Sequence, residues 1–170
     1  GEVAVNNGSD EFVDLAFKAF TRPGDRVVVV EPTFEIYSLV ARAAGVEVRA
    51  VLVDEDLALD PRRVVEAAEG AKLVFICSPN NPTGRHYGLD ELREVAEGCR
   101  SLVVVDEAYV GFADWDSLKL ALDLENVLVL RSFSKVAGLA GLRVGYAVGR
   151  PEVLKMLKRV DLPFKVNSVA

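Results

Sequence analysis

Histidine and cysteine, the side chains that most metal and redox sites need, are scarce: the 170-residue sequence has one histidine and two cysteines. Cys77 and Cys99 do not have the spacing of a metal-binding pair, so we expect no zinc or other metal site. Both are most simply explained as buried free thiols in a reducing compartment.

A basic surface and a long apolar segment are also missing. The formal net charge is −6, which argues against a nucleic-acid-binding surface. No apolar run approaches the length of a membrane span, and no signal peptide opens the chain. We therefore expect a cytoplasmic protein without a membrane or nucleic-acid partner.

Two glycine-rich nucleotide-binding motifs are absent as well. The sequence contains neither the Walker pattern of glycine, four residues and Gly-Lys-Ser/Thr nor the pattern G-x-G-x-x-G. A phosphate-loop protein and a nicotinamide-dependent oxidoreductase therefore lose their main support. The oxidoreductase stays open as a weak alternative.

What the sequence does contain is a regular alternation of strand and helix patterns. Runs at 26–30, 73–77, 102–105 and 127–130 have the uniform hydrophobicity of strands buried on both faces, and further strands are expected at 46–53 and 142–148. Helical spacing occurs between them, including a helix expected over 115–124. This alternation predicts one α/β domain, a three-layer α/β/α structure with a mostly parallel central sheet.

Five candidate ligand-binding residues come directly after expected strands. They are Ser9, Phe34, Asn81, Asp106 and Lys135. Each also has a plain structural explanation as a helix cap, a core side chain, a turn residue or a solvated charge. Ligands of parallel sheets bind outside the carboxyl ends of the strands, so the shared position favours one site at that edge.

The segment after the strand at 127–130 carries the most informative chemistry. Lys135 follows Ser132 and Ser134, and Arg143 lies eight positions further on. A lysine amine can form a Schiff base, while hydroxyls and a guanidinium can hold a phosphate through charge-assisted hydrogen bonds. This set fits an aldehyde cofactor that carries a phosphate. Asp106, placed after a buried strand, is expected to need a cationic partner or good hydrogen-bond donors.

Three motifs follow one another along the chain: NNPTG at 80–84, VDEAY at 105–109 and SFSK at 132–135, the last continued by GLAGLRVGY at 138–146. With them the sequence resembles the fold-type I pyridoxal-phosphate aminotransferases. Within that superfamily it is most similar to the histidinol-phosphate aminotransferase family, which NGSDE at 7–11 and LPF at 162–164 also favour.

The resemblance implies a role for each candidate residue. Lys135 would form the Schiff base with pyridoxal 5'-phosphate and shuttle the substrate proton, and Asp106 would pair with the pyridine nitrogen. Tyr109 and Asn81 would hydrogen-bond the phenolate oxygen, with Tyr109 completing the catalytic set. Phe34 would stack on the ring. The groups implied at the phosphate are the backbone groups of Ser9 and Asp10 and the side chains of Ser132, Ser134 and Arg143.

The resemblance covers essentially the whole chain but not the whole family pattern. An N-terminal arm and a C-terminal small domain, which carries the arginine for the substrate carboxylate, are expected to be absent. We therefore expect residues 1–170 to be a single large cofactor-binding domain. Lys165 stands where relatives commonly have asparagine, and nothing in the sequence explains it.

The implied activity is transfer of an amino group from a donor such as histidinol phosphate to a 2-oxo acid, in histidine biosynthesis. The implied assembly is a homodimer. Two alternatives share every residue named above: a pyridoxal-phosphate lyase such as threonine-phosphate decarboxylase, and a cofactor-binding fragment with little or no turnover.

Overall fold

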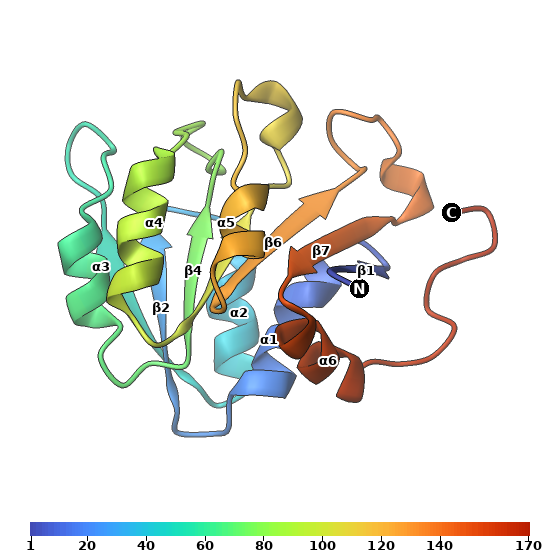
Figure 1. The fold of residues 1–170 in the computed structure, drawn as a ribbon, viewed down its shortest axis with the longest axis horizontal. Helices are drawn as coiled ribbons and strands as arrows, with labels where there is room; N and C mark the ends of the chain where they lie inside the picture. The colour runs from blue at the N-terminus through green and yellow to red at the C-terminus, as the bar shows by residue number, and fades with distance from the viewer.

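A seven-stranded sheet lies between two layers of helices in the computed structural model, which describes all 170 residues (Figure 1). The spatial order of the strands is β1-β7-β6-β5-β4-β2-β3. Their bounds are β1 Val3–Asn6, β2 Arg26–Glu31, β3 Glu47–Leu52, β4 Leu73–Cys77, β5 Leu102–Asp106, β6 Val127–Ser132 and β7 Gly145–Gly149.

Helices cover both faces of the sheet. The bounds are α1 Asp10–Phe20, α2 Ile36–Ala43 and α6 Pro151–Arg159 on one face, and α3 Pro61–Ala67, α4 Leu89–Gly98 and α5 Leu118–Asp123 on the other. Two short 3₁₀ turns are η1 Val110–Phe112 and η2 Ala140–Leu142. The predicted three-layer α/β/α structure is confirmed. No helix has the length and apolar character needed to cross a membrane.

Alternating side chains along the buried strands build two hydrophobic cores. In β2, Val27 and Val29 join the core under α1 and α2, whereas Val28 and Val30 join the core under α3 and α4. Full burial of one such side chain contributes roughly 1.5–3 kcal/mol. Every residue of β4 and β5 is buried, which is why all of them are apolar except Asp106 at the end of β5.

Strand direction brings the polar candidates to one edge of the sheet. Neighbouring strands from β3 through β6 pair in parallel. β7 is antiparallel to both β6 and β1, so β1 runs in the same direction as β6. The carboxyl ends of β1, β2, β4, β5 and β6 therefore share one edge, and the prediction of a mostly parallel sheet is confirmed.

Two predicted boundaries and one predicted burial are wrong. The last strand begins at Gly145 rather than at 142, because residues 140–142 form a 3₁₀ turn and Arg143 takes a left-handed φ of 53°. The helix expected over 115–124 is only Leu118–Asp123, because hydrogen bonds to Glu107 hold Ser117 just before the helix. Cys77 is buried, but Cys99 is only partly buried because it follows the end of α4.

Candidate functional site

A cavity of about 130 Å³ lies at the carboxyl edge of the sheet. All ten site residues predicted from the sequence line it: Ser9, Asp10, Phe34, Asn81, Asp106, Tyr109, Ser132, Ser134, Lys135 and Arg143. Cys77 and Ala108 complete the lining. The sequence thus predicted which side chains gather here, although they come from five different strand ends.

Asp106 ends β5 in the floor of this cavity and is 4% exposed. Its Oδ1 accepts a hydrogen bond of 3.0 Å from the backbone N–H of Ala108, and its Oδ2 accepts one of 2.8 Å from the hydroxyl of Tyr37. Burial raises the pKa of Asp106 to about 6, and the two hydrogen bonds work against that rise. The expected good donors are therefore present, and both are neutral groups.

Lys135 reaches into the cavity from the loop that follows β6. Its Nζ lies 5.0 Å from the centre of the Tyr109 ring, within the range of a cation–π contact. The Oγ of Ser132 accepts a 3.0 Å hydrogen bond from the backbone N–H of Ser134, which shapes the turn before the lysine. An amine, a phenol and a buried carboxylate are thus brought together around one space.

Beside the lysine, four residues form what we call the anion cradle: Ser9, Asp10, Ser134 and Arg143. Ser9 is the N-cap of the 11-residue α1 and makes no side-chain capping bond, so the positive end of the helix is open to an anion. Nη1 of Arg143 lies 3.4 Å from the Ser134 Oγ, and its Nη2 lies 3.9 Å from the Asp10 carboxylate. These long contacts leave guanidinium N–H groups for an anion such as phosphate.

Two glycines let the cradle close. A Cβ added at Gly145 would lie 2.4 Å from the backbone nitrogen of Ser9, and one added at Gly8 would lie 2.6 Å from Nη2 of Arg143. Gly8 also has a φ of +88°, which a side chain disfavours. The close approach of β7 to the start of α1 therefore requires Gly145, and the backbone conformation before α1 favours a glycine at position 8.

Phe34 and Asn81 line the cavity from two different loops. Phe34 is 38% exposed, and its ring meets that of Tyr37 edge-on, with centres 6.3 Å apart. The amide of the buried Asn80 donates to the carbonyl of Pro32 at 2.8 Å, which ties the loop of Asn81 to the loop of Phe34. Asn81 and Tyr109 also line a wider neighbouring cavity of about 480 Å³. An apolar ring and an amide thus join the amine, the phenol and the carboxylate around the cavity.

This arrangement has counterparts among known proteins. The family model described as aminotransferase class I and II matches residues 1–170. The chain belongs to that family. The match confirms the resemblance to aminotransferases that the three sequence motifs indicate.

Relatives of this aminotransferase family member share most of its length. The histidinol-phosphate aminotransferase of Symbiobacterium thermophilum is 46% identical over 170 residues, which are 98% of this chain and 47% of the relative. The histidinol-phosphate aminotransferase of Methanopyrus kandleri is 44% identical over 168 residues, which are 97% of this chain and 43% of the relative.

Among solved structures, histidinol-phosphate aminotransferase from Sinorhizobium meliloti in complex with pyridoxal-5'-phosphate has a TM-score of 0.86 at 24% identity, covering 94% of this chain and 45% of that one. At this identity the match shows the fold alone. The family member spans about half the length of the relatives it matches.

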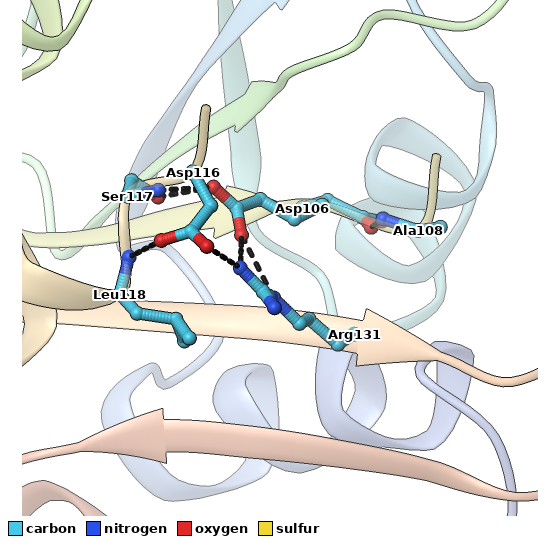
Figure 2. A network of polar contacts seen from close by, with 7 residues as sticks. Asp106, Ala108, Asp116, Ser117, Leu118 and Arg131 are labelled. Carbon is cyan, nitrogen blue, oxygen red and sulfur yellow. Dashed lines mark hydrogen bonds and ion pairs between the residues drawn. The ribbon is translucent and has the colours of Figure 1, made fainter. Parts of the chain in front are cut away.

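Sequence reasoning missed a buried ion pair beside the site of this aminotransferase family member (Figure 2). Glu107 is 1% exposed, and one of its oxygens accepts 2.6 Å hydrogen bonds from both the N–H and the hydroxyl of Ser117. The other oxygen accepts from Nε and Nη2 of Arg131 at 2.9 and 2.8 Å. Arg131 also lies 3.0 Å from the Asp116 carboxylate. Each charged side chain of this network therefore has a partner of opposite charge.

The network joins the end of β5, which carries Asp106, to the end of β6, which leads to Lys135. Glu107 directly follows Asp106 at the end of β5, and Arg131 directly precedes Ser132 at the end of β6. Burial raises the pKa of Glu107, and the hydrogen bonds from Ser117 and the charge of Arg131 oppose the rise. A second acidic residue after a buried strand was the available signal, because it too requires a partner.

Proposed function

We propose that the chain binds pyridoxal 5'-phosphate in this cavity and is the cofactor-binding large domain, residues 1–170, of an aminotransferase. The single observation that carries the proposal is that ten residues predicted from separate parts of the sequence line one cavity. Membership of the aminotransferase family supports the class of reaction.

The lining suits the parts of this cofactor. The anion cradle, through the backbone groups of Ser9 and Asp10 and the side chains of Ser134 and Arg143, would hold the phosphate together with Ser132. The face of Phe34 would pack on the ring. Asp106 would pair with the protonated ring nitrogen, for which a buried carboxylate offers a strong partner. Asn81 and Tyr109 would donate to the phenolate oxygen. Arg143 would thus supply a positive charge to the phosphate, and Asp106 a negative charge to the ring nitrogen.

When bound, the cofactor supplies an electron sink for the carbanion formed at the α-carbon of an amino donor. Lys135 would bond to the cofactor aldehyde through Nζ and later carry the substrate proton on that same atom. Asp106 would hold a proton on the ring nitrogen, and Tyr109 would fix the orientation of the ring. These three residues are the proposed catalytic set.

For the complete protein we propose the transfer of an amino group between histidinol phosphate, or a similar amino donor, and a 2-oxo acid. Support comes from the names of the relatives at 44% and 46% identity. We also propose a homodimer that works in the cytoplasm. The lyase alternative shares the same cavity, and products formed from amino donors by the complete protein would separate the two reactions.

The test is covalent trapping of the cofactor. Incubation with pyridoxal 5'-phosphate should produce a visible absorbance band that borohydride abolishes, and peptide mapping should place the reduced label on Lys135. Lys135→Ala should lose the band and keep its circular dichroism spectrum. Lys119→Ala, a change at an exposed lysine of α5, is the control and should retain it. A label on Lys119, or no label on any lysine, would contradict the proposal.

A further inference from the structure

Tyr37, a buried residue of α2, donates a hydrogen bond to the site from the helical layer behind it. Its side chain is fully buried at 0% exposure, and its hydroxyl lies 2.8 Å from Oδ2 of Asp106. Tyr37 does not line the cavity. Its polar atom therefore serves Asp106 and does not meet a ligand.

Aromatic packing fixes the direction of this hydroxyl. The Tyr37 ring stacks on Phe75 of β4 with centres 5.0 Å apart and planes at 17°, and Phe75 in turn stacks on Phe17 of α1 at 5.3 Å. The Phe34 ring meets Tyr37 edge-on. A ring held from two sides cannot swing to water without opening the core, so the donor stays on Asp106.

Tyr37 also remains a donor at every ordinary pH. Burial, with the nearby charge of Asp106, holds the pKa of Tyr37 well above its usual value of 10.0. The phenol therefore keeps its proton and donates a hydrogen bond to the ionised carboxylate. The ionised carboxylate has no proton with which to donate one in return.

The other groups around Asp106 make this donor important. Asp10 and Glu107 both disfavour a negative charge on Asp106, and Cys77 on the adjacent strand is a neutral thiol, since burial raises its pKa to about 12. The cations Lys135 and Arg143 lie around the same cavity. Within hydrogen-bond distance, only Tyr37 and the Ala108 N–H stabilise the ionised form.

We propose that Tyr37 is a positioning residue, which orients Asp106 and keeps it anionic so that it can hold the protonated ring nitrogen of a heteroaromatic cofactor. The tyrosine acts through Asp106 and touches no ligand. This inference rests on the proposed function for the identity of the cofactor, but the contact between Tyr37 and Asp106 is independent of it.

The first test uses Tyr37→Phe, which removes one oxygen and keeps the ring. In the chain without cofactor, carbon-13 NMR of the aspartate carboxyls should show the pKa of Asp106 rising above its value of about 6. Affinity for pyridoxal 5'-phosphate should fall about tenfold to a hundredfold, the range for a lost hydrogen bond to a charged group. Tyr87→Phe is the matched control, because Tyr87 is 2% exposed but belongs to the core on the opposite face of the sheet.

The second test asks whether the effect passes through Asp106. In an Asp106→Asn background, Tyr37→Phe should change cofactor affinity less than about twofold, because the coupling of two contacting residues disappears when one is already altered. An equal loss in both backgrounds would show that Tyr37 only supports the fold and would overturn the proposal. So would an unchanged Asp106 pKa in Tyr37→Phe.

The proposal can also be tested if the Tyr37→Phe variant does not fold or if the chain binds no cofactor. If the phenylalanine variant does not fold, 3-fluorotyrosine can be incorporated at the tyrosines, which keeps the ring and makes the hydroxyl a more acidic donor. The pKa of Asp106 should then fall. An unchanged pKa of Asp106 would overturn the proposal. If the unaltered chain binds no pyridoxal 5'-phosphate, the proposed function fails, whereas the NMR measurement still decides whether Tyr37 controls Asp106.

Discussion

Replacing Asp106 with asparagine is expected to stabilise the cofactor-free chain near neutral pH, although it removes a carboxylate that the proposed function needs. The pKa of Asp106 is about 6 in the folded chain, against an ordinary value of 3.8. Between these values the folded chain holds a proton that the unfolded chain has released. The free energy of unfolding therefore falls as the pH rises from about 4 to about 6, and the loss is complete above that window.

The size of the effect follows from the two pKa values. A difference of about 2, at about 1.4 kcal/mol for each pKa unit, gives roughly 3 kcal/mol. Asparagine does not titrate, so this part of the pH dependence should vanish in Asp106→Asn. Relative to the unaltered chain, the variant should gain up to roughly 3 kcal/mol between about pH 4 and pH 7.5.

Urea unfolding followed by circular dichroism across that pH range measures the difference directly. Taking the variant minus the unaltered chain cancels other titrating groups, including Glu107. Asp56→Asn, the same substitution at an exposed turn, is the control. A difference for Asp106→Asn that does not vary with pH would refute the reasoning that burial of an unpaired carboxylate costs stability here.

Two further predictions concern the supports of the site. Arg131→Met should cost about 3 kcal/mol of unfolding free energy by urea titration, the low end for breaking a buried pair, because Glu107 keeps its Ser117 donors. Arg93→Met, which removes a partly exposed pair at 3.4 Å, should cost about 1 kcal/mol or less, and equal costs would show that the buried network adds nothing. Gly145→Ala should abolish cofactor binding measured by absorbance titration, because its Cβ would lie 2.4 Å from backbone atoms at the start of α1. In the control Gly141→Ala the new Cβ meets no atom within 4 Å, so this variant should bind the cofactor normally. Normal cofactor binding by Gly145→Ala would contradict the close approach of the two segments.

Much of the fold could be predicted because its information is local. The runs that became β4 and β5 are apolar at every position, and only a strand covered on both faces suits such a pattern. The gathering of the candidate residues at one edge followed from the same reasoning, because residues after parallel strands share that edge. Phe34, Asn81 and Asp106 were found in this way, although no single one of them distinguishes a ligand site from a turn or a core residue.

The parts that could not be predicted depend on contacts between distant segments. Tyr37 has the helical spacing of an ordinary core residue, and only the folded chain brings its hydroxyl to Asp106, 69 positions away. The start of β7 was misplaced because Arg143 adopts a left-handed conformation in the folded chain. Likewise, the short α5 reflects the hold of Glu107 on Ser117, which nothing in the sequence around 115–124 reveals.

The pairing of β1 with β7 has a consequence for how the chain folds. Val3 lies opposite Val148 in this pair, so β1 can form these hydrogen bonds only with a strand that lies far along the chain. Closing so long a loop costs entropy that no local contact repays, and contacts of this kind slow folding. The anion cradle spans the same junction, with Ser9 on one side and Arg143 on the other. A phosphate bound there would connect two segments that are far apart in the sequence. Because it would bind only the folded state, it would stabilise the pairing of β1 with β7 at the antiparallel edge of the sheet.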